Sequence, residues 1–314
     1  MTLEPVAQAG QTQLFRIPLP TPWGDPVYPC LLLDADHAIL VDTGCQTEAS
    51  REALLAALDR QLGDRKIDAI VMTHAHQDHY GGLDAVQPRN HSPVLCWTRA
   101  REYYETYPKE ILDRPRLLHA LCDRLGVKGA RREQVTSGFD SVALRSAATL
   151  ISGTLEDGET LRIGGLEMVA HHHPGHHHHT LVLEVPALRA AITADNLFAG
   201  HLSPPTVEFC ADGRRRQGLP LLVRSLNRLA QLDINLAVPS HGDLIDTPSA
   251  SATKAAAAYQ RHAERIAKLS QGHRGDLVEL LQLAFGEIPL PLWGLRMAFL
   301  LGYLDLAGLG DELR

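Results

Sequence analysis

The feature that most constrains the fold is a histidine cluster that directly follows a short apolar run. The run Ala69–Met72 has the length and composition of a buried strand, and Thr73–His79 then reads Thr-His-Ala-His-Gln-Asp-His. In extended chain, residues i and i+2 point the same way, so His74 and His76 can converge on one point. Imidazole and carboxylate are ligands that Zn²⁺ and similar cations accept. The segment therefore predicts a metal site at the end of a strand.

Composition indicates an ordinary globular protein. The chain has 314 residues, of which 45% are hydrophobic and 21% charged, so it can bury a large core. Its apolar runs are too short to span a bilayer, and Met1–Gly10 lacks the basic and apolar regions of a signal peptide. The five cysteines are scattered and form no CxxC pair, which favours a reducing compartment. We expect a cytoplasmic protein with no membrane partner.

Charge argues against a nucleic-acid partner and favours a small-molecule substrate. Lys and Arg number 30 against 37 Asp and Glu, a net charge of −7. The densest basic run, Arg214–Arg216, is short enough to be a solvated turn. A polyanion needs a stripe of basic side chains, and the sequence does not show one.

The order of apolar and helical patterns predicts an α/β fold with two similar halves. The first half has strands at Val27–Leu33, Ala38–Val41 and Ala69–Met72, with a helix capped by Ser50 in between. In the second half, Gly164-Gly165 predicts a hairpin. The strands and helix expected after it are Leu181–Val185, Ala190–Thr193, Leu219–Leu229 and Leu236–Val238.

Residues 99–148, between the two halves, predict a helical insertion. They are rich in Arg, Glu, Leu and Ala, and a helix is expected over Arg131–Leu144. The insertion can be a solvated decoration or a wall over the metal edge. Tyr103, Tyr104 and Tyr107 lie at i, i+1 and i+4, so two of them share a helical face. They are candidates to line a substrate pocket, although packing in a helix core explains them equally well.

Metal-type side chains follow short strands at four places. After the first cluster come His176, Asp195 and His241. Strand ends of α/β sheets meet at one edge, where ligands bind. The motifs are Leu40-Val41-Asp42-Thr43-Gly44, Thr73–His79 with Gly81-Gly82, Pro174-Gly175-His176, Ala194-Asp195 and Pro239-Ser240-His241-Gly242. In this order they resemble those of the metallo-β-lactamase superfamily.

The resemblance implies a four-layer αβ/βα sandwich with two divalent metal ions, zinc in first place and manganese or iron as alternatives. One ion would be held by His74, His76 and His176, and the other by Asp78, His79 and His241, with Asp195 bridging. Asp78 is also the catalytic candidate, because it can orient a metal-bridging hydroxide or relay its proton. Asp42 would fix the tautomer of an imidazole rather than bind metal.

The histidine-rich turn leaves an alternative open. Histidines occupy 171–173 and 176–179, and His176 is assigned because the Pro-Gly turn aims the next side chain inward. His172 or His178 could compete for the same metal position. His201, soon after Asp195, is a further candidate for the substrate pocket.

The predicted function is a two-metal hydrolase that cleaves a small carboxylic derivative, namely a thioester, lactone or ester. A phosphodiesterase or single-strand nuclease could use the same two metals. The superfamily also includes mononuclear iron dioxygenases acting on persulfides, which the full second ligand set disfavours. A non-catalytic binding protein is disfavoured because every ligand position is filled.

Two domains are expected, residues 1–250 and a helical module at 251–314. The module is similar to the C-terminal helices of members resembling hydroxyacylglutathione hydrolase. Its expected helices are Ala252–Leu269, Asp276–Phe285 and Leu292–Leu306. It would pack on the main domain or form a homodimer contact through Leu295, Phe299 and Leu300.

Overall fold

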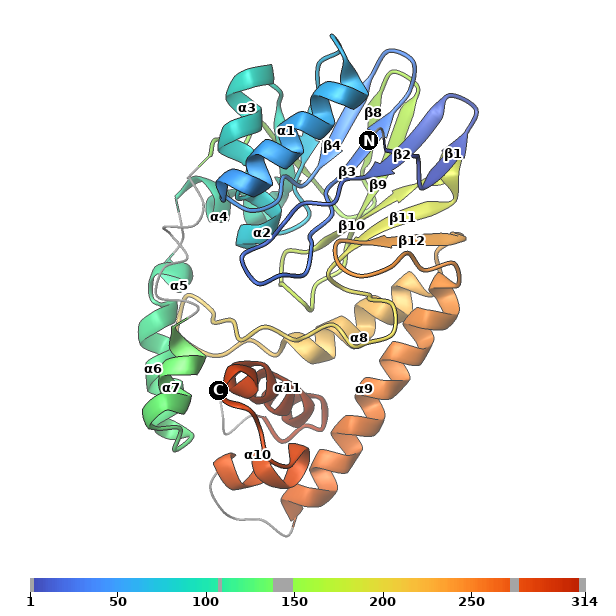
Figure 1. The fold of residues 1–314 in the computed structure, drawn as a ribbon. Helices are drawn as coiled ribbons and strands as arrows, with labels where there is room; N and C mark the ends of the chain where they lie inside the picture. The colour runs from blue at the N-terminus through green and yellow to red at the C-terminus, as the bar shows by residue number, and fades with distance from the viewer. Residues whose placement is uncertain (1–2, 107–108, 138–148, 272–276, 311–314) are drawn as a thin grey trace.

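Two β-sheets make up the upper part of the molecule as drawn in Figure 1, and the C-terminal helices lie below them. The computed structural model describes residues 3–106, 109–137, 149–271 and 277–310. One sheet has the order β1-β2-β3-β4-β5-β6-β7, with strands Ala7–Ala9, Thr12–Arg16, Cys30–Leu33, Ala38–Val41, Ala69–Val71, Val94–Trp97 and Gly153–Leu155. The other has the order β12-β11-β10-β9-β8, with strands Leu236–Pro239, Ala190–Ala194, Leu181–Val185, Leu166–His172 and Thr160–Ile163.

Alternating side chains give the sandwich its layers. In β10, Leu181 and Leu183 belong to the hydrophobic cluster that includes the strands of the first sheet. Val182 points to the opposite face and belongs to a second cluster with Leu222 and Leu226 of α8 (Gly218–Leu229). Figure 1 shows α1 (Glu48–Leu62) and α3 (Leu83–Asn90) on the outer side of the first sheet. The fold is thus the expected α/β sandwich with a C-terminal helical extension.

Local predictions are largely confirmed, with one cap misplaced. The hairpin at Gly164-Gly165 joins the antiparallel strands β8 and β9. Ser50, however, is not the helix cap: α1 begins earlier, and Thr47 accepts a hydrogen bond from the Ser50 amide. The Ser50 hydroxyl instead accepts from the Cys45 amide, at 3.1 Å. The periodic leucines located the helix but could not choose between two hydroxyl residues near its start.

The insertion is helical where the structure describes it. It contains α4 (Arg101–Glu105), α5 (Lys109–Leu112), α6 (Arg114–Arg124) and α7 (Gly129–Thr136). Most of the helix expected over 131–144 lies outside the described residues, which stop at 137 and resume at 149. Leu121 of α6 and Val135 of α7 are buried in the second cluster, so these two helices are more than a solvated decoration.

The C-terminal helices share that second cluster. They are α9 (Pro248–Gln271), α10 (Leu277–Phe285) and α11 (Trp293–Leu306). Phe299 and Leu300 are buried against the rest of the chain, so of the expected dimer contact only Leu295 is exposed. The reason is that α11 is surrounded by α7, α8, α9 and α10 rather than lying on the surface.

Short helical segments complete the described chain. They are α2 (Gln77–Tyr80) and the 3₁₀ turns Thr98–Ala100, Pro186–Leu188 and Leu290–Leu292. Within the described ranges, a membrane-crossing helix of sufficient length and hydrophobicity is not found. The segments Leu277–Phe285 and Leu290–Leu306 reach that length only jointly, across a bend of 108°.

Candidate metal centre

Four strand ends deliver the predicted side chains to one edge of the sandwich. The chain leaves β5 into the histidine cluster, turns between β9 and β10 at His176, and leaves β11 and β12 at Asp195 and His241. The backbone is unusual at two of these points. Asp42, just after β4, has φ 61°, and Ala194 has φ 48° at a register shift between β11 and β12. Left-handed residues of this kind re-aim the next side chain and often mark functional sites.

Three imidazole nitrogens meet in a first group. Nε2 of His74 lies 3.0 Å from Nδ1 of His76, and Nε2 of His176 lies 3.1 Å from the same Nδ1. His74 donates its Nδ1–H to the Thr73 hydroxyl at 3.1 Å, and His176 donates its Nδ1–H to the Pro204 carbonyl at 2.9 Å. Their inward Nε2 atoms therefore carry lone pairs. A single proton on His76 cannot satisfy both, so the three nitrogens are arranged as a cation would require.

Two imidazoles and two carboxylates form a second group. Nε2 of His241 lies 3.2 Å from Asp78 Oδ2, and His241 donates its Nδ1–H to the Pro26 carbonyl. Asp195 lies between the groups: its Oδ1 is 3.5 Å from Nε2 of His79, and its Oδ2 is 3.4 Å from Nε2 of His176. Asp195 thus lies close to a nitrogen of each group.

Asp42 supports the second group from behind. Its Oδ1 accepts the Thr73 amide at 2.8 Å, and its Oδ2 accepts the Thr73 hydroxyl at 2.7 Å. The same Oδ2 lies 2.8 Å from Nδ1 of His79, which fixes the ring so that Nε2 faces Asp195. This is the position expected for a residue that sets a tautomer rather than one that binds metal.

The electrostatics of both groups fit bound cations. Burial lowers the pKa of His74 well below its usual value, and burial together with His176 lowers the pKa of His76 to about 3, so both rings are neutral. Burial would also lower the pKa of His79, but three surrounding carboxylates, Asp195 foremost, raise it well above its usual value. Nε2 of His79 and Oδ1 of Asp195 are buried without a hydrogen-bond partner among the described residues. A divalent cation would neutralise the excess negative charge and would give both unpaired atoms a partner.

The competing histidines of the turn point elsewhere. His172 stacks on Trp97 at 4.2 Å and its Nε2 donates to the His178 carbonyl. His178 places Nδ1 3.0 Å from Oε1 of Glu208. The geometry therefore favours His176 over both alternatives.

Glu208 is a buried acid that sequence reasoning missed. Its Oε1 lies 3.2 Å from Nε2 of His177, and its Oε2 accepts the His178 amide. Nδ1 of His177 accepts the His179 amide, so Nε2 carries the proton and donates to Glu208. These bonds are complete without a cation, so we do not assign a metal here. Glu208 stands in no motif, and nothing in its local sequence could have flagged it.

The predicted substrate-pocket residues are not brought together. Tyr104 is fully buried and packs on Tyr80, and Tyr103 is buried against His177–His179. Tyr107 lies outside the described residues. His201 is exposed and stacks on Phe198 at the rim of a hollow of about 270 Å³ beside α9.

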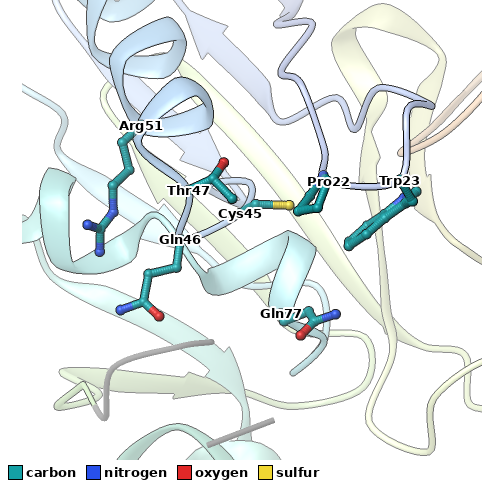
Figure 2. Close-up of a pocket in the computed structure, with 7 residues that line it drawn as sticks. All are labelled: Pro22, Trp23, Cys45, Gln46, Thr47, Arg51 and Gln77. Atoms are coloured by element: carbon teal, nitrogen blue, oxygen red, sulfur yellow. The ribbon is translucent and has the colours of Figure 1, made fainter. Parts of the chain in front are cut away.

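A larger pocket opens beside the start of α2 (Figure 2). Its volume is about 570 Å³, and it is lined by Pro22, Trp23, Cys45, Gln46, Arg51 and Gln77 among others. Gln77 stands between two predicted ligands in the chain. Burial raises the pKa of the Cys45 thiol to about 12, and the nearby Asp78 carboxylate adds to the rise. Through Gln77 the pocket lies next to Asp78 in the chain, and sequence reasoning did not find it.

Comparison with known proteins identifies the family. A family model described as the metallo-beta-lactamase superfamily matches residues 23–241. The chain belongs to this superfamily. With its His/Asp clusters able to bind metal ions, it is a metallo-hydrolase of the superfamily.

Relatives within the metallo-β-lactamase superfamily extend the likeness to most of the chain. A "probable metallo-hydrolase" of Bacillus subtilis is 28% identical over 300 residues, covering 93% of this chain and 90% of that one. A "linear primary-alkylsulfatase" of Pseudomonas is 28% identical over 65% of this chain, but the match spans 39% of that protein. A solved metallo-beta-lactamase family protein of Thermus thermophilus has a TM-score of 0.74 at 23% identity, with 94% of each chain covered. At that identity the structural likeness shows the fold alone.

Proposed function

We propose that this protein is a dinuclear zinc hydrolase that cleaves a small carboxylic derivative, a thioester, lactone or ester. The observation that carries the proposal is the convergence of unprotonated ring nitrogens on one point beside a second, acidic group. His74, His76 and His176 would hold one cation, and Asp78, His79 and His241 the other, with Asp195 between them. Bound there, the cations would supply a hydroxide at neutral pH and polarise the substrate carbonyl.

The protein's own residues would prepare that chemistry. Asp42, Thr73 and the Pro26 and Pro204 carbonyls accept the outer Nδ1 protons, so that Nε2 of each of these rings faces the site. His79 and His241 hold the pKa of Asp78 low despite its burial, so Asp78 is an anion that can accept a hydrogen bond from the reacting water and orient it. Asp195 cannot do so as readily, because it faces both groups at once.

A carbonyl substrate is favoured over a polyanion by charge. The basic run Arg214–Arg216 does not form a free basic surface, because Arg215 is buried in an ion pair with Asp305 and Arg214 pairs with Asp212 at the surface. The expectation of a plain solvated turn is therefore wrong for Arg215. The five free cysteines and this surface agree with the proposed cytoplasmic, small-molecule role.

A sulfate-ester hydrolase is the second candidate, because 211 residues of the chain align with an alkylsulfatase. The test is to purify the protein without chelator, measure its metal content, and assay a thioester, a lactone, an alkyl sulfate and a bis-aryl phosphodiester. We expect near two equivalents of metal and turnover of the first two. Turnover of the sulfate or the phosphodiester alone would overturn the carbonyl substrate, and a metal content that stays at one after zinc or manganese is added would overturn the dinuclear site.

A further inference from the structure

The pocket beside the start of α2 has two chemically different walls. Figure 2 shows Trp23 and Pro22 on one side and Gln46 and Arg51 on the other. The first wall comes from the loop between β2 and β3, and the second from the start of α1. At about 570 Å³ the pocket has the size of sites for small molecules. Its lining therefore bears on which part of a substrate can lie next to the metals.

Trp23 presents an aromatic face that the chain leaves uncovered. It is 48% exposed, whereas the other two tryptophans, Trp97 and Trp293, are buried. Its loop is nevertheless held in place: Leu19 and Val27 exchange backbone hydrogen bonds at its base, and the Thr21 hydroxyl donates to the Asp25 carbonyl at 2.6 Å. An indole on a fixed loop at a pocket rim offers a large apolar surface to a flat ligand at little entropic cost.

The opposite wall is polar but carries no net charge. Of the described residues that line the pocket, Arg51 is the one with a charge, and Asp84 of α3 pairs with its guanidinium. An anionic ligand would have to compete with Asp84 for Arg51, whereas a neutral amide or hydroxyl would not. The side-chain oxygen of Gln77 is buried and accepts no hydrogen bond from a described residue, so rotation of that amide can satisfy a ligand donor.

We propose that this pocket binds the non-reacting part of the substrate, and that this part is an uncharged group with a flat apolar face for Trp23 and an amide or hydroxyl for Gln46 and Gln77. The inference rests on the proposed hydrolase function and names its substrate class: neutral aryl or amido-aryl acyl derivatives. Acyl groups that end in a carboxylate, sulfate or phosphate are rejected, because Asp84 already neutralises Arg51.

The first test compares substrates with the same thioester and different distal groups. The metal-loaded enzyme is assayed with N-acetylphenylalanyl, 3-phenylpropanoyl, hexanoyl and succinyl thioesters. We expect kcat/KM for the first to exceed that for the succinyl compound at least tenfold. Trp23→Ala should raise KM for the two aromatic substrates about tenfold with little change for hexanoyl, and Trp23→Phe should restore most of it. Leu283→Ala, which removes an equally exposed apolar side chain on α10, is the control.

The second test changes the charge of the polar wall. Asp84→Asn leaves Arg51 unpaired, and we expect it to shift the succinyl-to-hexanoyl ratio of kcat/KM about fivefold to tenfold toward succinyl. An unchanged ratio, with the variant folded, would overturn the assignment of neutral substrates.

Binding without turnover separates the pocket from the chemistry. Trp23 is the exposed tryptophan, so N-acetylphenylalanine amide in the pocket should quench fluorescence in the wild type and in metal-depleted protein, but not in Trp23→Phe. Quenching without hydrolysis of any thioester would support the pocket and refute the proposed function. Hydrolysis with no quenching and no effect of Trp23→Ala would refute the pocket and leave the hydrolase standing.

Discussion

At the level of single residues, the bond at the outer nitrogen of an imidazole decides which nitrogen faces the centre. Thr73 accepts the Nδ1 hydrogen bond of His74, Asp42 accepts that of His79, and the Pro204 carbonyl accepts that of His176. Each of these partners lies on a different segment, so the lone pairs converge only in the folded chain. The folded chain therefore holds a set of metal-type ligand atoms in place, and some of these buried polar atoms have no hydrogen-bond partner among the described residues. Bound cations would give them one.

Asp195→Ala should remove metal and activity together. Asp195 is the carboxylate that faces both groups, and its loss leaves neither with a complete set of donors. We expect kcat/KM to fall about 100-fold or more and metal content to drop. Elemental analysis and the thioester assay measure both, with Asp212→Ala on the exposed turn as control. Normal turnover in Asp195→Ala would mean that the two groups do not share this carboxylate.

His173→Phe should make the protein less sensitive to acid. His173 is buried with both ring nitrogens unpartnered among the described residues, and burial lowers its pKa to about 3. Between its unfolded pKa near 6.5 and that value, the unfolded chain binds a proton that the folded chain does not. Stability therefore decreases as the pH is lowered, by about 2 kcal/mol at pH 5. Urea unfolding at pH 7.5 and 5.0 should show a smaller loss for His173→Phe than for wild type. The exposed His91→Asn is the control, and an equal loss in all three proteins would contradict this origin of acid sensitivity.

At the level of elements, close approach between segments fixes the turns that carry the donors. Gly175 has φ 151°, and a Cβ there would lie 2.3 Å from the Leu222 Cα of α8. A Cβ on Gly82 would lie 2.3 Å from the Thr43 carbonyl oxygen, so α2 and α3 can press on the loop after β4. Helices thus dock on the turns themselves, and the donors inherit the rigidity of both sheets.

Gly175→Ala should destabilise the protein and disturb its metal site. The side chain meets the α8 backbone, which cannot rotate away, and the backbone angle is strained as well. We expect a loss of about 2–5 kcal/mol in the free energy of unfolding, with reduced metal content. Gly158→Ala, at φ 82° with open space around it, isolates the strain alone and should cost about 1–2 kcal/mol with metal retained. Equal effects of the two variants would show that packing against α8 is unimportant.

At the scale of the whole molecule, the candidate centre ties the two sheets together. His74 to His79 follow β5 of the first sheet, whereas His176, Asp195 and His241 follow strands of the second. The second hydrophobic cluster joins the insertion, α8 and the C-terminal helices on the far side of that second sheet. Cations held at the shared edge would therefore clamp halves that are otherwise joined by the central core.

Removal of metal should lower thermal stability reversibly. Cations that bind the folded chain and not the unfolded one stabilise it in proportion to the logarithm of their concentration over Kd. We expect dialysis against a chelator to lower Tm by about 5–10 °C and added zinc to restore it. Asp195→Ala should show a smaller response. A Tm that does not respond to chelator in the wild type would contradict metal binding across the two sheets.

The sequence by itself determined the family, the α/β class and the places where donors follow strands. Those signals are local. An apolar run followed by His-X-His-X-Asp-His, or a Pro-Gly turn before His176, can be recognised without knowing which residues are close in the folded chain. The hydrogen bonds of His176, His172 and His178 are set by folding, so only the tertiary structure could distinguish these residues, and its geometry favours His176.

The same holds for the pocket and for the tyrosines. Trp23, Gln46 and Gln77 line one pocket although they come from three separate segments, and no local pattern in the sequence predicts that arrangement. The spacing of Tyr103 and Tyr104 in the sequence is the same whether their side chains are buried or exposed, and in the structure both are buried. Periodicity specifies a face of an element, and packing alone specifies what that face meets.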